Sequence, residues 1–168
     1  MKKLLIIILS VIIFSLNSCQ TSGIKTQKDD FTGDSRTFCE LGFPMGPLGL
    51  DLGKLQLILV RRIDNTSQEY YYSYVYYYNE SWAFIDKLSI KYGSAPPLEF
   101  KNTKYDRDTV SWAPGQINET VFFDLTKEDM VKLSSDEIVQ LRISGKKRNF
   151  TVELSNKQKE KIKEFLNY

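Results

Sequence analysis

The residues that this chain lacks narrow the chemistry open to it. Its 168 residues include no histidine, which removes Ser-His-Asp and Cys-His nucleophiles and the common zinc sites that contain histidine. Its two cysteines, Cys19 and Cys39, are too few for a zinc site made of thiolates. The sequence also has no glycine-rich phosphate loop. We therefore expect no catalytic residues of these kinds, no metal site and no cofactor.

Carboxylates are the remaining candidates for catalysis. A glycoside hydrolase needs only two acidic groups about 5–9 Å apart, and the one tight acidic cluster is Asp106-Arg107-Asp108. Because aspartate is common in surface turns, we interpret this cluster as a solvated turn beside Tyr105. Asp64 does not extend it to a calcium site, since the spacing and the glycine of an EF-hand loop are missing. The sequence therefore favours a protein that is not an enzyme.

A run of tyrosines is the strongest candidate for a functional surface. In an extended strand the side chains alternate between two faces, one of which should belong to the core. Five tyrosines of the run share a face, namely Tyr70, Tyr72, Tyr74, Tyr76 and Tyr78. Such rings suit a half-buried pleated surface, and packing alone explains them. The alternative is an aromatic platform for a sugar or a protein, helped by Trp82 or Trp112.

These tyrosines need a strand to position them, and the sequence predicts a hairpin. Leucines alternate at the start of Leu55–Ile63, the segment Asp64–Ser67 has the composition of a turn, and the tyrosine run follows. A further strand or bent pair of strands is expected within Trp82–Tyr92. Two more segments are short candidates for edge strands, Leu98–Phe100 and Thr109–Trp112.

The C-terminal part has the clearest pattern. Alternating apolar residues predict three strands, over Thr120–Leu125, Glu137–Ser144 and Phe150–Leu154. Thr126 with Asp129, and Ser155 with Gln158, have the spacing of capping boxes, so each pair predicts the start of a helix. The predicted fold class is α+β. It is mainly an antiparallel β-sheet or sandwich of about seven strands, with two short helices in the C-terminal third.

The N-terminus has the organisation of a signal peptide. Met1-Lys2-Lys3 precedes an apolar stretch that ends at Leu16 and is too short to span a bilayer as a helix. The residues Leu16-Asn17-Ser18-Cys19 resemble the lipobox of bacterial lipoproteins. That resemblance implies cleavage before Cys19 and attachment of lipid, with acyl chains such as palmitate, to this cysteine. The alternative is an ordinary signal peptide with an incidental cysteine.

The same resemblance sets the expected domain boundaries and location. Residues 1–18 would be the signal peptide, 19–37 a lipidated flexible tether and 38–168 a single β-rich globular domain. Lipid on Cys19 would hold the protein to the membrane of the cell envelope. Gln20 favours the outer membrane, with the domain facing the periplasm or the cell surface, because in this family an aspartate there would favour the inner membrane. The segment Glu119–Gly145 also resembles small envelope lipoproteins, which implies no activity.

Charge and cysteine content limit the partners. The 23 basic residues exceed the 21 acidic residues by two, and Lys2 and Lys3 would leave with the signal peptide. A mature chain without net charge argues against nucleic acid as a partner. Cys39 would be the remaining thiol. We expect it to be buried, as free cysteines usually are, and a reactive thiol is the alternative.

The residues leave three hypotheses of function open. The favoured one is a membrane-anchored, non-catalytic envelope lipoprotein that binds a protein or glycan partner through its β-sheet. The alternative is a periplasmic inhibitor or immunity-type protein that blocks an enzyme. A carboxylate-dependent hydrolase comes last, because it would need two acids in one cleft, one of them with a raised pKa.

Overall fold

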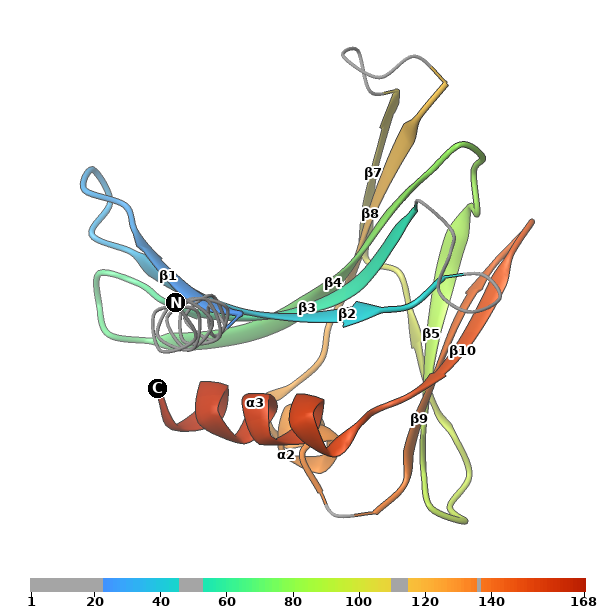
Figure 1. Ribbon diagram of the computed structural model, residues 1–168. Coiled ribbons are helices and arrows are strands. Elements are labelled where there is room, and N and C mark those ends of the chain that lie inside the picture. Colours follow the sequence, from blue (N-terminus) through green and yellow to red (C-terminus); the bar gives the residue numbers. More distant parts are fainter. Residues whose placement is uncertain (1–22, 46–52, 110–114, 136) are drawn as a thin grey trace, which may run out of the picture.

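Two antiparallel sheets with helices packed beside them form the fold (Figure 1). The computed structural model describes residues 23–45, 53–109, 115–135 and 137–168. Every strand pairing within these ranges is antiparallel. This confirms the predicted α+β class, built mainly from antiparallel sheet.

The larger sheet has six strands in the order β1-β2-β3-β4-β8-β7. Their bounds are β1 Ile24–Lys28, β2 Ser35–Phe43, β3 Lys54–Ile63, β4 Glu69–Asn79, β7 Lys104–Thr109 and β8 Ile117–Phe123. The sheet bends, so that one face is convex and turned toward the helices, and the opposite face is concave (Figure 1). We call these the inner and the outer face of the larger sheet.

The smaller sheet has four strands in the order β10-β9-β5-β6. The bounds are β5 Ile85–Tyr92, β6 Leu98–Lys101, β9 Val139–Gly145 and β10 Asn149–Glu153. Two helices, α2 (Lys127–Leu133) and α3 (Asn156–Asn167), precede β9 and follow β10. Helix α3 packs against β2 and α2, so both helices lie on the convex side of the larger sheet (Figure 1).

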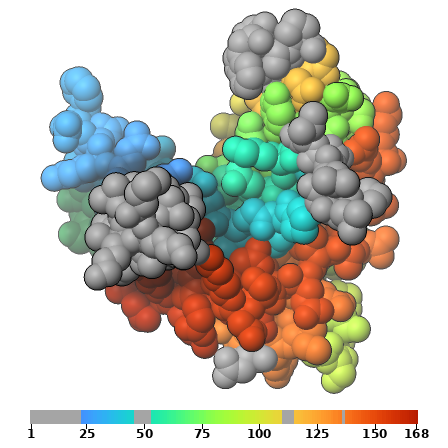
Figure 2. Space-filling view, viewed as in Figure 1, coloured from blue at the N-terminus to red at the C-terminus, as the bar shows by residue number. Residues whose placement is uncertain are grey.

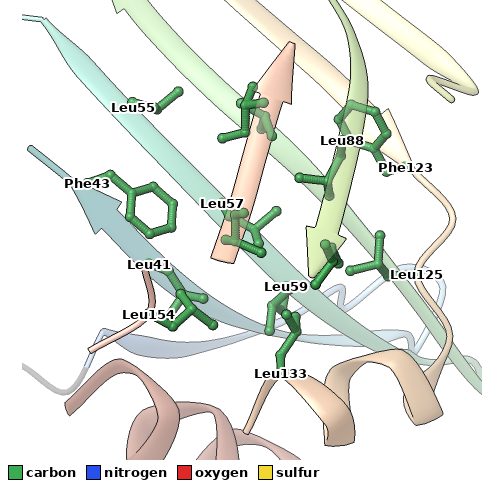
Figure 3. Close-up of a cluster of buried hydrophobic side chains, with 14 of the residues drawn as sticks. Leu41, Phe43, Leu55, Leu57, Leu59, Leu88, Phe123, Leu125, Leu133 and Leu154 are labelled. Atoms are coloured by element: carbon green, nitrogen blue, oxygen red, sulfur yellow. The ribbon is translucent and has the colours of Figure 1, made fainter. Parts of the chain in front are cut away.

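A single hydrophobic core lies between the two sheets and the helices (Figure 3). The larger sheet contributes Leu57 and Phe123, the smaller sheet contributes Leu88, and α2 contributes Leu133. All four side chains are fully buried. Burial of one such side chain stabilises a fold by roughly 1.5–3 kcal/mol, so the pairing of the two sheets is secured by side chains that are far apart in the sequence.

The predicted hairpin around the tyrosine run is confirmed, and one aspartate organises its turn. β3 and β4 pair in register from Ile63 opposite Glu69 onward. The carboxylate of Asp64 accepts hydrogen bonds from the Thr66 hydroxyl (2.6 Å) and from the backbone amides of Thr66 and Gln68 (2.9 Å each). These bonds hold the pKa of Asp64 below its ordinary value. Because a slip of one residue would exchange the two faces of a strand, this turn decides which tyrosines face the core.

Both predicted capping boxes are confirmed. The Thr126 hydroxyl accepts from the Asp129 amide while the Asp129 carboxylate accepts from the Thr126 amide, and Ser155 and Gln158 do the same at the start of α3. Each box satisfies amides that the first turn of a helix leaves without a partner. The strands predicted around these helices are confirmed as β8, β9 and β10, with a shift of a few residues at their ends.

The predicted tether is wrong over Ile24–Lys28. This segment is β1 and pairs along its whole length with β2, which itself begins at Ser35. The sequence lacks the alternation of a buried strand because only Ile24 is buried. Polar contacts hold the other positions, among them an ion pair between Lys25 and Glu40 (2.9 Å). An edge strand is stabilised by backbone hydrogen bonds on one side, which no apolar pattern reveals.

The cluster Asp106-Arg107-Asp108 was predicted to be a turn, and this prediction is wrong. The cluster is the centre of β7. It pairs with β8, and Arg107 lies opposite Glu119. The aspartates point to one face of the strand and Arg107 to the other. Together with β1, this strand raises the count above the seven that the sequence suggested. Of the predicted edge segment Thr109–Trp112, only Thr109 belongs to the described residues, where it ends β7.

Cys39 is buried, as predicted. Its side chain has no exposed surface, and its sulfur lies 3.9 Å from the carbonyl oxygen of Lys161 on α3. Burial raises the pKa of the Cys39 thiol to about 12. The thiol is therefore protonated at neutral pH and serves as a small apolar side chain of the core.

Candidate binding face

The tyrosine run separates into two faces, as predicted. Val75 and Tyr77 point inward and are fully buried in the core. Tyr70, Tyr72, Tyr74, Tyr76 and Tyr78 point to the outer face, where Tyr70 is exposed and the other four are half-buried. The candidate site is thus the concave outer face of the larger sheet around these five rings. We call it the tyrosine face.

Cross-strand pairing extends the tyrosine face across the sheet. The row through its centre runs Glu40, Ile58, Tyr74, Phe122 and Lys104, from β2 to β7. The rings of Tyr74 and Phe122 lie 5.4 Å apart in a tilted arrangement, and the Lys104 ammonium lies 5.7 Å from the Phe122 ring centre. The centre of the row is therefore apolar, and its two ends have opposite charge.

Two aliphatic side chains form the floor of the tyrosine face. Val60 pairs with Tyr72, and Ile58 with Tyr74, on the same face. Val60 has no exposed surface and Ile58 is 6% exposed, although both belong to the face turned away from the core. Neither residue was predicted to belong to the site. The unbroken apolar run Leu57–Val60 could have identified them, because such a run indicates a strand that is covered on both faces.

The hydroxyl groups of the tyrosine face are used unequally. The Tyr76 hydroxyl donates to the side-chain oxygen of Asn118 (3.0 Å), and the Arg62 guanidinium lies 5.9 Å from the centre of the Tyr70 ring. Among the described residues, the hydroxyls of Tyr72 and Tyr74 form no hydrogen bond. Burial raises the pKa of Tyr74, so its hydroxyl stays protonated and can both donate and accept a hydrogen bond.

Two ion pairs, each of one basic and one acidic side chain, lie at the rim of the tyrosine face. At the end near the β3–β4 turn, Arg62 donates to the Asp34 carboxylate, with its Nε at 2.9 Å. On the β1–β2 side, Lys25 pairs with Glu40. At the β7 edge, Lys104, Asp106 and Asp108 form no ion pair with another described residue, so this edge presents both signs of charge. A rim of mixed charge has little net potential and would not attract a strongly charged partner over a distance.

The space-filling view shows a hollow on the concave side of the larger sheet, which the bend of that sheet creates (Figure 2). The β1–β2 hairpin, in blue, and the tip of β7 and β8, in yellow to orange, stand apart above the surface of β2 and β3, in cyan (Figure 2). We expect a partner of the tyrosine face to enter this hollow.

Two other predicted members of the site lie elsewhere or outside the described residues. Trp82, in the connection between β4 and β5, packs against the core, with its ring 6.0 Å from that of Phe84. It therefore lies on the core side and does not extend the tyrosine face. Trp112 and the predicted lipidation site Cys19 lie outside the described residues.

Glu119 is the most deeply buried acid among the described residues, and its contacts are structural. Its carboxylate accepts hydrogen bonds from three successive backbone amides, those of Ala83 (2.5 Å), Phe84 (2.9 Å) and Ile85 (3.0 Å). Arg107 pairs with it at 3.3 Å. This clamp ties β8 to the connection that leads into the smaller sheet. Phe84 adopts a φ of 54° within it, a conformation that costs a residue with a side chain about 1–3 kcal/mol.

The remaining acids are dispersed. Asp106 and Asp108 are exposed on β7, and Asp64 is occupied in its turn. Among the described residues, no three Asp, Glu or Cys side chains approach one another closely enough to hold a metal ion.

Within the described part of the chain, no helix has the length and apolar character that a membrane span requires. Comparison of the chain with models of protein families, with curated proteins and with solved structures finds no match.

Proposed function

We propose that this protein is a non-catalytic lipoprotein of the bacterial cell envelope, anchored by lipid on Cys19, that binds a protein or glycan partner through the tyrosine face. The observation that supports it most directly is the concave row of half-buried tyrosines on the face turned away from the core. The core has no need of these rings, since the opposite face of the same strand already supplies Val75 and Tyr77 to it.

Physical properties of tyrosine favour this use. Its ring offers a large contact area, and its side chain loses little conformational entropy because it has few rotatable bonds. Here the rings stand on a floor of Ile58 and Val60, and neighbouring rings pack against them, so they are held in place before a partner arrives. A site that is ordered in advance loses less free energy to immobilisation on binding.

The charges support a partner with little net charge. Two ion pairs compensate part of the charge around the tyrosine face, and its β7 edge presents both the Lys104 ammonium and the carboxylates of Asp106 and Asp108. A protein that binds nucleic acid needs an excess of basic side chains to contact the phosphates. The tyrosine face has no such clear excess of basic over acidic side chains. A protein surface or a neutral glycan fits the rings and free hydroxyls of Tyr72 and Tyr74.

The test is capture of a partner from a detergent extract of the cell envelope by the full chain, tagged at its C-terminus. We expect the variant with both Tyr72→Ala and Tyr74→Ala to bind the partner at least about 30-fold more weakly, since loss of even one aromatic hot spot costs about 2 kcal/mol or more. Tyr168→Ala is the matched control, because Tyr168 is 66% exposed at the end of the chain. It should bind as the wild-type protein does.

Thermal unfolding of each variant separates a loss of binding from a loss of fold. Digestion of the extract with protease or with glycosidases before capture then distinguishes a protein from a glycan. Binding that is equal in the double variant and the wild type would refute the tyrosine face as the site. Capture of an enzyme together with loss of its activity would favour the inhibitor hypothesis instead.

The anchor has its own test. Cys19→Ala removes the thiol that lipid attachment requires, so we expect this variant to accumulate as uncleaved precursor or as soluble protein. The measurement is fractionation of cells into membrane and soluble parts, with the molecular mass determined in each. A Cys19→Ala protein that is fully processed and still bound to the membrane would contradict the proposed anchor.

A further inference from the structure

A second hollow lies on the smaller sheet, on the face turned away from the core. It encloses about 460 Å³, and its lining includes Lys87, Ser89 and Lys91 of β5 and Gln140, Arg142 and Thr151 of the neighbouring strands. This size is typical of sites for small ligands. We propose that this groove binds an acidic carbohydrate chain, through its carboxylate groups and its hydroxyls.

The basic groups of the groove are closer together than sheet stability favours. Ser89 lies directly opposite Arg142, and Lys87 and Lys91 flank Ser89 on the same face of β5. Each lysine is therefore a diagonal neighbour of Arg142, at a spacing of about 7–8 Å, where like charges repel. Such repulsion costs stability in the free protein, and a bound anion would relieve it.

Two acids lie on this face of the smaller sheet, Glu99 on β6 and Glu153 on β10, the latter opposite Gln140, and neither forms an ion pair with Arg142 or Lys91. Glu99, opposite Ser89 on β6, pairs with Lys87 at 2.9 Å. In the residues that the structure describes, Arg142 and Lys91 form no ion pair. Arginine presents a planar set of N–H donors that matches a carboxylate with two parallel hydrogen bonds. The groove thus has a free arginine and a free lysine positioned for an anionic group.

Neutral polar groups of the groove match the hydroxyls of a sugar. Ser89, at the floor, is 7% exposed, and its hydroxyl forms no hydrogen bond to another described residue. Thr151 lies opposite Arg142 on its other side, and Gln140 lies opposite Lys91. Hydroxyl and amide groups both donate and accept hydrogen bonds, as sugar hydroxyls do. Inorganic phosphate would use only the donors and would face the Glu99 carboxylate.

The groove is separate from the tyrosine face. It is formed by β5, β6, β9 and β10 of the smaller sheet, whereas the tyrosine face belongs to the larger sheet. The inference therefore does not depend on the proposed function, and the two can fail independently.

Isothermal titration of the full chain in detergent tests the groove, with oligogalacturonate as the acidic carbohydrate. Three further ligands serve as comparisons, namely a maltooligosaccharide of equal length, inorganic phosphate and glycerol 3-phosphate, which stands for a lipid headgroup. We expect binding of oligogalacturonate alone, weakened by added salt. Arg142→Gln should weaken it about tenfold or more, since charge-assisted hydrogen bonds are among the strong ones.

Matched variants make the result specific. Lys157→Gln removes the same charge from an exposed position on α3 and should bind oligogalacturonate as the wild type does. Arg142→Lys should recover part of the affinity. The double variant of Tyr72 and Tyr74 should bind it unchanged, even if it has lost the partner of the tyrosine face. Absence of binding to the wild type, equal affinity of Arg142→Gln, or tighter binding of either phosphate compound would each overturn the inference.

Discussion

Glu119→Ala is expected to lower the free energy of unfolding by about 3–5 kcal/mol, the cost of breaking a buried charged pair from one side. The Glu119 carboxylate is fully buried and accepts from the amides of Ala83, Phe84 and Ile85. Alanine would leave these three donors without a partner, and it would leave Arg107 without its counter-charge. A domain of this size has a total stability of roughly 5–15 kcal/mol, so the variant would be close to unfolding.

Urea unfolding, followed by circular dichroism, measures this loss. Glu119→Gln is the matched control, because it keeps the shape of the side chain but replaces one acceptor oxygen with a donor. We expect its stability to lie between those of the wild type and Glu119→Ala. Arg107→Ala should cost less than Glu119→Ala, because the carboxylate loses its counter-charge but keeps its three amide hydrogen bonds. Wild-type stability of Glu119→Ala would show that the clamp does not hold the two sheets together.

Tyr77→Ala is expected to cost about 3–5 kcal/mol, as truncation of a buried aromatic side chain does. Tyr77 is fully buried, and its ring centre lies 5.6 Å from that of Phe150 on β10. Its hydroxyl donates to the carbonyl oxygen of Ser81 at 2.9 Å. The truncation would open a cavity between the two sheets and leave that carbonyl without its partner.

The adjacent Tyr76 provides the control, because it is the same residue type on the same strand but points to the outer face. Tyr76→Ala should cost clearly less, since it removes one hydrogen bond to Asn118 and creates no enclosed cavity. Unfolding by urea compares the two variants directly. Equal losses, or a larger loss for Tyr76→Ala, would contradict the assignment of the two faces of β4.

Elements that depend on neighbouring residues were predictable from the sequence. The capping boxes at Thr126 and Ser155 join residues three positions apart, so their spacing predicts the helices directly. The β3–β4 hairpin follows in the same way from its alternation and from the turn at Asp64. The polar edge strands β1 and β7 were missed, because pairing with a distant strand, and not an apolar period, makes them strands.

The candidate site was predictable in part. Alternation along one strand places five tyrosines on a common face, and this much needs no tertiary structure. The sequence alone could not decide whether that face or the other would be buried. The tertiary structure decided it, because the core forms on the side where the smaller sheet and the helices pack.

The sequence by itself thus determined the local elements and the sharing of one face by the five tyrosines, and it is the basis for the proposed anchor at Cys19. The tertiary structure alone decided the order of the strands, the floor of Ile58 and Val60, the clamp of Glu119 on amides some 35 residues away and the basic groove around Arg142. The physical reason is the separation along the chain between the residues that interact. Turns, caps and alternation arise between neighbours in the chain, whereas the pairing of strands and the burial of a face depend on contacts between distant segments.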